Sequence, residues 1–352
     1  MRSALGMGLL IMNRNFFLLI AVQFIAFCVA AQKSGIPRLF RDEKPVTVRL
    51  NYAMGKVKNS TNDTLYFSSY LAYQNEQGNW DSLAINLRAR GNFRRRNCNF
   101  PPLRIKMKKN DAKNTPFAGN KSLKLVVPCL YGKRNDDLIM KEYLCYQLYK
   151  VITPYSFNVR LANLTLGNAS GKHIKSYPTV AFFIEDDDLM ADRFKAKVID
   201  SVNLHPRQMQ DTSAIRHDFF EFMIANTDWS TTFFHNIKVI ETPSRKFIAV
   251  PYDFDLAGVV NAPYATWDES LEITSVRERV YRGFCRSDGL TEYMRAEYLR
   301  NEPKIFDVIN RFESSFEPRE FAGIKKYMAE FFTTMKEDRR FKLTVAQKCR
   351  RN

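Results

Sequence analysis

The sequence has few of the residues that build common metal and redox sites. Its 352 residues include 6 cysteines and 4 histidines, and no cysteines form a CxxC pair or have the spacing of a zinc site. Zinc-finger and thioredoxin-like classes are therefore excluded. The sequence also has no low-complexity segment and no internal repeat period, which excludes a repeat array or a largely disordered chain.

Long apolar runs are also scarce. The clearest run, residues 16–29, follows Arg14 and ends just before the small residue Ala31, which is typical of a signal peptide. We expect a signal peptide over residues 1–31, cleavage near Ala31 and a mature start at Gln32. The alternative is a retained membrane anchor, for which the run is short. No later stretch is apolar enough to cross a membrane, so we expect an exported chain that is periplasmic, secreted or on the cell surface.

Acidic residues are in the minority. The chain has 54 lysines and arginines against 37 acids, which gives a formal net charge of +17. An excess of this size favours acidic partners such as nucleotides, phosphorylated surfaces, anionic glycans or acidic proteins. The sequence has no recognised nucleic-acid motif, and export argues against nucleic acid as the partner.

The cysteines after the signal peptide are odd in number. Export permits disulfides, and an odd number requires at least one free thiol or a bridge to another chain. The sequence does not give the pairing. The five residues are Cys98, Cys129, Cys145, Cys285 and Cys349.

The two halves of the chain have different periodicity. Alternating apolar and polar residues indicate strands over much of residues 45–187. Beyond residue 187 the pattern is mainly helical, beginning with an amphipathic segment at 212–226. We predict an α+β fold with a strand-rich N-lobe of residues 32–187, a helix-rich C-lobe of residues 188–352, and a cleft between them. A helix inserted among the strands has an apolar face of Leu138, Ile139, Tyr143, Leu144, Leu148 and Ile152.

Polar residues lie at both ends of a predicted β-hairpin in the segment NTDWSTTFFHNIKVIETPSRKFIAVPYDFDLA, residues 226–257. Asp228 lies in a loop after a helix, Asn236 enters the first strand, and Asp253 follows the second. Because a hairpin brings strand ends together, we expect these residues to lie close. One Asp can then accept a proton while an Asn and an Asp hold a divalent cation, as phosphoryl transfer in kinases requires. The alternative is a set of ordinary helix-end and turn residues.

The same segment resembles the signature of the CotH family of exported, spore-coat-type atypical protein kinases. Other segments resemble family motifs in the same order: LRARGNFRRRNCNFPPLRIKM, LKLVVPCLYGKRNDDLIMKEYLCYQLYKVI and YPTVAFFIED. The resemblance covers roughly residues 85–290 and implies an atypical protein-kinase-like bilobe. Where the family's helix usually starts with a pattern containing Arg-Asn, this chain reads MKEYL, and this departure leaves room for a non-catalytic member.

The resemblance also implies roles for individual residues. Asp228 would be the catalytic base, Asn236 and Asp253 metal ligands, and Asp255 a second candidate ligand. The arginines near Gly91 suit a polyphosphate, or form a solvated loop of a basic protein. The implied nucleotide-binding residues are Gly91 and Asn92 through their backbone, Lys106 with Arg104 as its rival at the phosphates, Glu142 as a partner of Lys106, and Phe183 to Glu185 at the adenine.

We therefore predict an exported kinase that transfers the γ-phosphoryl group of ATP to an unidentified exported protein, with Mg²⁺ or Mn²⁺. One alternative is a catalytically silent relative that binds an anionic partner. Another is a transferase that acts on a glycan or lipid, or that moves a nucleotide. A kinase requires metal-dependent nucleotide binding, whereas an anion binder responds to polyanions and to salt. The sequence gives no oligomeric state.

Overall fold

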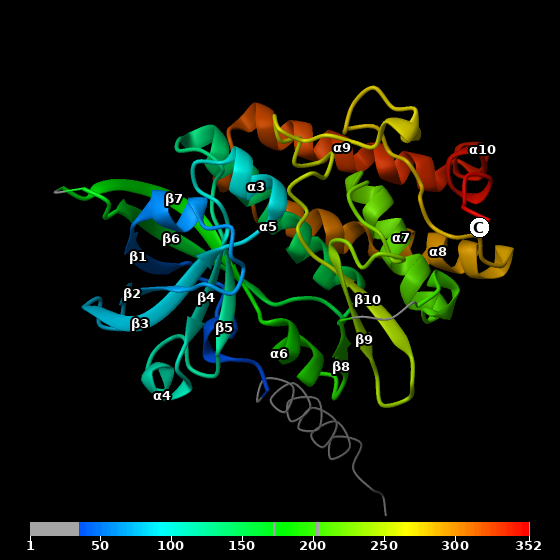
Figure 1. Cartoon of the computed structure of the whole chain (residues 1–352). Coiled ribbons are helices and arrows are strands. Elements are labelled where there is room, and N and C mark those ends of the chain that lie inside the picture. Colours follow the sequence, from blue (N-terminus) through cyan, green and yellow to red (C-terminus); the bar gives the residue numbers. More distant parts are fainter. Residues whose placement is uncertain (1–34, 172, 201–203, 352) are drawn as a thin grey trace, which may run out of the picture.

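The computed structural model of the chain describes residues 35–171, 173–200 and 204–351. Strands β1 to β7 gather on one side of the molecule and helices α7, α8 and α9 on the other, with helix α5 between them (Figure 1). The expected signal peptide and its cleavage position near Ala31 lie outside the described residues.

The strands are β1 (Val46–Tyr52), β2 (Phe67–Gln74), β3 (Trp80–Ala89), β4 (Leu103–Met107), β5 (Ser122–Val126), β6 (Val159–Asn168), β7 (Lys175–Ile184), β8 (Lys197–Ile199), β9 (Ile237–Glu241) and β10 (Phe247–Pro251). The α-helices are α2 (Met54–Asn59), α3 (Asn92–Asn97), α4 (Lys109–Ala112), α5 (Lys133–Ile152), α6 (Asp187–Asp192), α7 (Asp211–Ile224), α8 (Asp288–Asn310), α9 (Pro318–Lys336) and α10 (Asp338–Phe341). Short helical turns are η1 (Arg38–Phe40), η2 (Pro206–Gln208), η3 (Glu269–Leu271), η4 (Glu313–Ser315) and the π-helix η5 (Lys342–Ala346).

Strands β1 to β7 form a closed barrel in the order β1-β2-β3-β4-β5-β7-β6. Six of the seven contacts are antiparallel, whereas β1 and β6 run parallel, with Val46 opposite Ala162 and Tyr52 opposite Asn168. Because side chains alternate across a strand, one face of each strand fills the barrel interior. That core includes Val48, Leu50, Leu71, Leu87, Ile105, Leu123, Leu125, Leu164 and Phe183.

The predicted atypical kinase-like bilobe, with a separate strand-rich N-lobe and a helix-rich C-lobe, is wrong. The strand-rich region closes into a mixed seven-stranded barrel, and a second apolar core runs without a break from its outer face into the helices. This core joins Phe182 of β7 and Tyr146 of α5 to Phe220 of α7 and Phe254 after β10. Closure depends on a parallel contact between strands distant in sequence, which local alternation does not reveal.

Helix α5 is buried on more sides than its predicted apolar face. Tyr143 packs against Phe182 of the barrel with ring centroids 5.6 Å apart. On the other side, Tyr149 packs against Phe220 of α7 at 4.6 Å. A helix covered on several sides needs no single apolar stripe. Helix α5 packs against both the barrel and the helices, and its Glu142 is buried between them.

A second, smaller sheet supports the predicted hairpin. Its order is β10-β9-β8, and both contacts are antiparallel.

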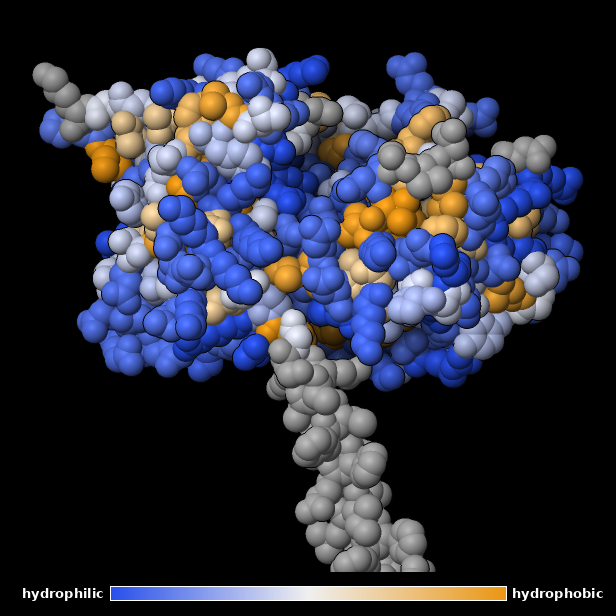
Figure 2. Space-filling view, turned by 60° about the horizontal axis from the view of Figure 1, so that its bottom comes forward, coloured by the Kyte–Doolittle hydropathy of each residue, from blue (hydrophilic) through white to orange (hydrophobic). Residues whose placement is uncertain are grey.

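Hydrophilic side chains cover most of the face shown in Figure 2, and its apolar side chains lie in separate patches. Among the described helices, none is both long enough and apolar enough to cross a membrane.

Candidate active site

Helix α7 delivers the first acid of the site. The helix ends at Ile224, and its C-cap Ala225 has a left-handed φ of 51° that turns the chain sharply. Asn226 then stabilises the loop, because its Oδ1 accepts a hydrogen bond from the backbone N of Asp228 at 3.1 Å. Its backbone carbonyl also accepts one from Trp229 Nε1 at 3.1 Å. The loop therefore holds Asp228 directly beyond the helix end.

The carboxylate of Asp228 has two close partners. His235 Nε2 lies 2.9 Å from its Oδ1, and Asn236 Nδ2 donates to its Oδ2 at 2.8 Å. Ser230 and His235 exchange two backbone hydrogen bonds at 3.0 Å, which closes the intervening loop. The hydrogen bond with Asp228 raises the pKa of His235. His235 therefore helps to orient the acid.

The hairpin brings Asp253 next to this group. Tyr252 N donates to the carbonyl of Asn236 at 2.9 Å, which joins the end of β10 to the start of β9. Asp253 has a left-handed φ of 65°, and its backbone N donates to the hydroxyl of Tyr146 on α5 at 2.9 Å. Its carboxylate faces Arg90, with Nη2 3.6 Å from Oδ2. Helix α5 thus helps to place Asp253.

These residues line one cavity of about 480 Å³. Cavities of this size suit small organic ligands. The connection between β3 and β4 contributes to it from the barrel side, and the segments around the hairpin contribute from the helical side. Its lining consists of Arg90, Gly91, Phe93, Arg94, Pro102, Asp228, Phe234, His235, Asn236, Tyr252, Asp253, Asp255, Leu256 and Thr266.

A buried cluster of opposite charges forms one wall of the cavity. Arg94, which is 5% exposed, places its Nη1 3.7 Å from Glu142 Oε2 and its Nε 3.9 Å from Asp255 Oδ2. Burial, and then the charge of Asp253, raise the pKa of Asp255 to about 7. Burial, and then the charge of Asp255, hold the pKa of Glu142 well above its usual value.

Several polar atoms of this wall lack a hydrogen-bond partner among the described residues. They are Arg90 Nη1, Arg94 Nε, Arg94 Nη1 and Glu142 Oε1. Buried donors and acceptors are costly when they are unpaired. Both arginines line the cavity and face carboxylates across it, Arg90 toward Asp253 and Arg94 toward Glu142 and Asp255. The wall therefore combines cations with acids at distances longer than a hydrogen bond.

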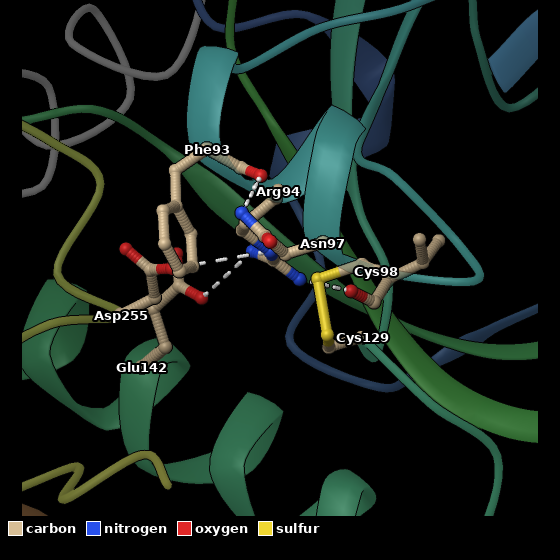
Figure 3. The surroundings of a disulfide bond; sticks show 8 residues. Phe93, Arg94, Asn97, Cys98, Cys129, Glu142 and Asp255 are labelled. Carbon is tan, nitrogen blue, oxygen red and sulfur yellow. Dashed lines mark hydrogen bonds and ion pairs between the residues drawn. A yellow bond between two sulfur atoms is a disulfide. The ribbon is translucent and has the colours of Figure 1, made fainter. Parts of the chain in front are cut away.

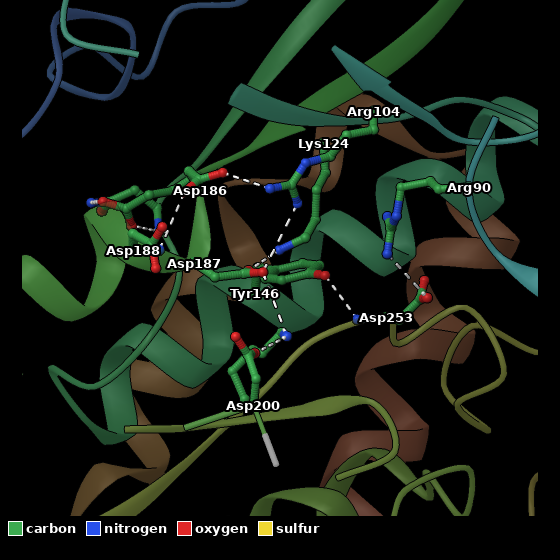
Figure 4. Close-up of polar contacts among 12 residues, drawn as sticks. Arg90, Arg104, Lys124, Tyr146, Asp186, Asp187, Asp188, Asp200 and Asp253 are labelled. Atoms are coloured by element: carbon green, nitrogen blue, oxygen red, sulfur yellow. Dashed lines mark hydrogen bonds and ion pairs between the residues drawn. The ribbon is translucent and has the colours of Figure 1, made fainter. Parts of the chain in front are cut away.

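A second cluster lies behind Tyr252, away from the cavity. Lys124 of β5 is buried and forms an ion pair with Asp187, and its ammonium group lies 5.1 Å from the ring centroid of Tyr252. Burial lowers the pKa of Lys124 to about 8, although Asp187 acts in the opposite direction. Arg104 binds the neighbouring Asp186 at 2.7 Å (Figure 4). Sequence reasoning missed Lys124, although a single lysine in the apolar run SLKLVV was a usable signal.

The nucleotide residues implied by the resemblance are dispersed. Gly91 lines the cavity, with a left-handed φ of 78°, and Asn92 begins α3 directly after it. Lys106 is exposed on β4, with its ammonium 4.4 Å from the ring centroid of Tyr66. Arg104 is occupied by Asp186. The structure therefore places Gly91 in the cavity lining but leaves Lys106 and Arg104 outside it.

The residues implied at the adenine also lie elsewhere. Phe183 points into the barrel core against Phe117, with ring centroids 5.6 Å apart. Glu185 is fully buried, where it lies 3.0 Å from Arg193 and accepts a hydrogen bond from Asn158 N at 2.8 Å. Glu142, implied as a partner of Lys106, faces Arg94 instead.

The site has oxygen donors that fit a divalent cation. Asn236 Nδ2 donates hydrogen bonds to Asp228, which leaves Oδ1 for a cation. The carboxylates of Asp253 and Asp255 line the same cavity. Oxygen donors of these kinds suit Mg²⁺ or Mn²⁺. Within the described ranges, no group of three or more His, Cys, Asp or Glu side chains is gathered closely enough to hold a metal ion.

The remaining cysteines are structural. Disulfides join Cys98 to Cys129 and Cys285 to Cys349, and the free thiol of Cys145 is buried on α5.

No known family model matches the chain, and a search of curated proteins found no match.

Proposed function

We propose that this cavity catalyses metal-dependent transfer of the γ-phosphoryl group of ATP to a hydroxyl group of an exported protein. The observation that carries the proposal is the convergence of Asp228, Asn236 and Asp253 on one cavity whose wall includes Arg90 and Arg94. Proton acceptor, oxygen ligands and cations are the components that phosphoryl transfer requires. The proposal rests on these local contacts and needs no kinase-like bilobe.

Asp228 is the proton acceptor in this proposal. Its side chain is 32% exposed, so an acceptor hydroxyl can reach it from the cavity. The bond between the γ-phosphorus and the bridging oxygen of ADP breaks, and a bond forms between the γ-phosphorus and the hydroxyl oxygen. The hydroxyl proton passes to Asp228, and ADP leaves with the bonding electron pair. The hydrogen bond from Asn236 keeps the other carboxylate oxygen in a fixed orientation.

Asn236, Asp253 and Asp255 would hold Mg²⁺ or Mn²⁺. The cation would neutralise negative charge on the phosphates. Asp255 fits this role because its raised pKa reflects burial beside the charge of Asp253, and a cation favours the ionised form of both acids.

The cavity wall would bind phosphate oxygens. Arg90 and Arg94 line the cavity, where phosphate oxygens would compete with Asp253, Glu142 and Asp255 for their N–H groups. Gly91 adds no side chain that would keep a ligand away from the backbone. Lys124 lies one aromatic ring away, behind Tyr252. Its ion pair with Asp187 would support this wall from behind.

The same arginines favour a second candidate, a catalytically silent protein that binds an anionic partner. The net charge of +17 agrees with such a role. In that case binding depends on Arg90 and Arg94 and weakens with salt, whereas Asp228 and added metal have no effect.

The deciding experiment is transfer of label from γ-labelled ATP by the purified full chain with Mg²⁺ or Mn²⁺. Asp228→Asn and Asp253→Asn are compared with Asp81→Asn, whose side chain is exposed on β3 and bonds Asn75 at 2.9 Å. Transfer that is lost in the first two variants and kept in the third supports the kinase. Label that transfers from the α-phosphate instead identifies nucleotide transfer, and absence of both transfer and metal-dependent ATP binding contradicts the proposal.

A further inference from the structure

A disulfide lies directly behind the cavity wall. Cys98 is the C-terminal cap of α3, the short helix that carries Arg94. Its partner Cys129 lies in the connection between β5 and α5. Figure 3 shows Arg94 between the disulfide on one side and the acids Glu142 and Asp255 on the other. The bridge therefore links the segment that carries Arg94 to the segment that leads into the helix of Glu142.

Helix α3 has little local support of its own. It has six residues, and its N-cap Gly91 makes no side-chain capping hydrogen bond. A helix this short is not stable in isolation. At its other end, the backbone N of Asn99 and that of Phe100 both donate to the carbonyl of Cys129, at 2.9 and 3.2 Å. The connection at Cys98 and Cys129 is thus a main anchor of α3.

Arg94 uses this anchor to bridge separate parts of the fold. Its Nη2 donates to the carbonyl of Val127, two residues before Cys129. Its other nitrogens face Glu142 on α5 and Asp255 after β10. The buried guanidinium forms ion pairs with both acids, so its position affects where each carboxylate lies.

We propose that Arg94 is a positioning residue for Asp255 and Glu142, and that the Cys98–Cys129 disulfide sets the position of Arg94. The cavity is then complete only in the oxidised chain. This inference rests on the proposed function of the cavity, to which it adds control by redox state.

The redox step is a simple exchange. A dithiol such as dithiothreitol gives two electrons and two protons to the disulfide, so that Cys98 and Cys129 become thiols and the dithiol becomes a cyclic disulfide. The end of α3 then keeps only its backbone hydrogen bonds to Cys129, and the position of Arg94 between the acids is less tightly fixed. Cys98 is fully buried and Cys129 is 8% exposed, so serine variants test the idea more directly than a reductant does.

The chain supplies a matched control. The second disulfide joins Cys285, before α8, to Cys349 near the end of the chain. Neither residue belongs to the cavity lining. Replacing this pair with serines removes a disulfide of larger sequence separation, 64 against 31 residues, and leaves Arg94 in place.

The test is a double-mutant cycle on kcat/KM for phosphoryl transfer. We expect Cys98→Ser/Cys129→Ser and Arg94→Met each to lower kcat/KM by roughly ten- to a hundredfold. The triple variant should have the same kcat/KM as Arg94→Met alone, because the disulfide acts through Arg94. The Cys285→Ser/Cys349→Ser control should stay within about twofold of wild type. Losses that multiply in the triple variant, or an equal loss in the control, would overturn the proposal.

A second readout does not depend on catalysis. Hydrogen exchange at residues 92–97 should accelerate in Cys98→Ser/Cys129→Ser and remain unchanged in the control pair. Unchanged exchange at α3 would overturn the redox inference even in an active enzyme. If exchange is faster in Cys98→Ser/Cys129→Ser but the wild-type chain transfers no phosphoryl group, the proposed function is contradicted. The inference that the disulfide positions Arg94 would then still be supported.

Discussion

Asn236 donates two hydrogen bonds to Asp228, one to its backbone carbonyl at 2.7 Å and one to its Oδ2 at 2.8 Å. The amide therefore fixes both the loop and the carboxylate of the proposed base, while its own oxygen is left for a cation. The proposal therefore gives Asn236 two roles, orienting the base and holding the metal.

Replacement of Asn236 tests this double role. We expect Asn236→Ala to lower kcat by on the order of 10²-fold or more, because the base loses its orientation and the metal loses a ligand. The concentration of Mg²⁺ that gives half-maximal transfer should rise in the same variant. A lower kcat without any change in the Mg²⁺ requirement would restrict Asn236 to orienting Asp228.

Removal of the Asp253 charge should uncouple nucleotide binding from the metal. Wild-type chain with Mg²⁺ and ATP at 100 times the Kd should gain about 2.7 kcal/mol in the free energy of unfolding. Asp253→Asn should lose most of that gain, and the chelator EDTA should have the same effect on wild type. The measurement is thermal unfolding with and without Mg²⁺, with Asp81→Asn as the control. Equal stabilisation of Asp253→Asn and wild type would show that Asp253 is no metal ligand.

Lys106 and Lys124 test two different views of the nucleotide site. The resemblance implies Lys106 at the phosphates, whereas the structure places Lys124 behind the cavity wall. Lys106→Met should leave ATP affinity within about twofold of wild type, because its ammonium lies on an exposed face over Tyr66. Lys124→Met should weaken ATP binding by roughly tenfold, because Asp187 then loses its buried partner behind the cavity wall. Calorimetric titration with a non-hydrolysable ATP analogue measures both. The opposite ranking would restore Lys106 to the site.

The buried His217 predicts a pH dependence of stability. Its Nδ1 lies 3.1 Å from Asp218 Oδ1 and its Nε2 lies 3.4 Å from Glu221 Oε1. Burial opposes its positive charge, but these acids outweigh burial and raise its pKa to about 9, from 6.5. The fold thus favours the protonated form, so this stabilisation is complete below pH 6.5 and is lost as pH rises through 9.

The loss should amount to roughly 3 kcal/mol at most in the free energy of unfolding. Urea unfolding of wild type and His217→Gln between pH 6 and pH 9.5 measures it, and the variant should show a flatter profile. Lys124 has the opposite effect above pH 8, because its lowered pKa favours the neutral form in the fold, so the comparison uses the difference between the two proteins. Parallel profiles would show that His217 is not charged in the folded chain.

Residues joined by local structure were predictable from sequence. Asn236 and Asp253 flank the two paired strands of one hairpin, whose geometry brings them together. Asp228 joins them through a short loop closed by Ser230 and His235. The alternating segments of the first half do form strands, because period-two patterning reflects a barrel with one filled face.

Residues placed by distant contacts were not predictable in this way. The hydroxyl of Tyr146 reaches Asp253 from α5, and Arg94 reaches Asp255 from α3. Neither contact has a local pattern. Alternation placed Lys106 on a face opposite Ile105 and Met107, but only the barrel register places it beside Asn86 and Ser122, outside the cavity lining.

The parallel contact between β1 and β6 also affects how the chain folds. The partner of β1 is a strand that ends at Asn168, so the barrel cannot close before that residue is available. Until then, β1 and the later strands present unpaired backbone edges, which readily join to other chains. Closure over so long a stretch is slow compared with hairpin formation. The period before β6 docks is therefore the stage of folding at which the chain is most exposed to aggregation.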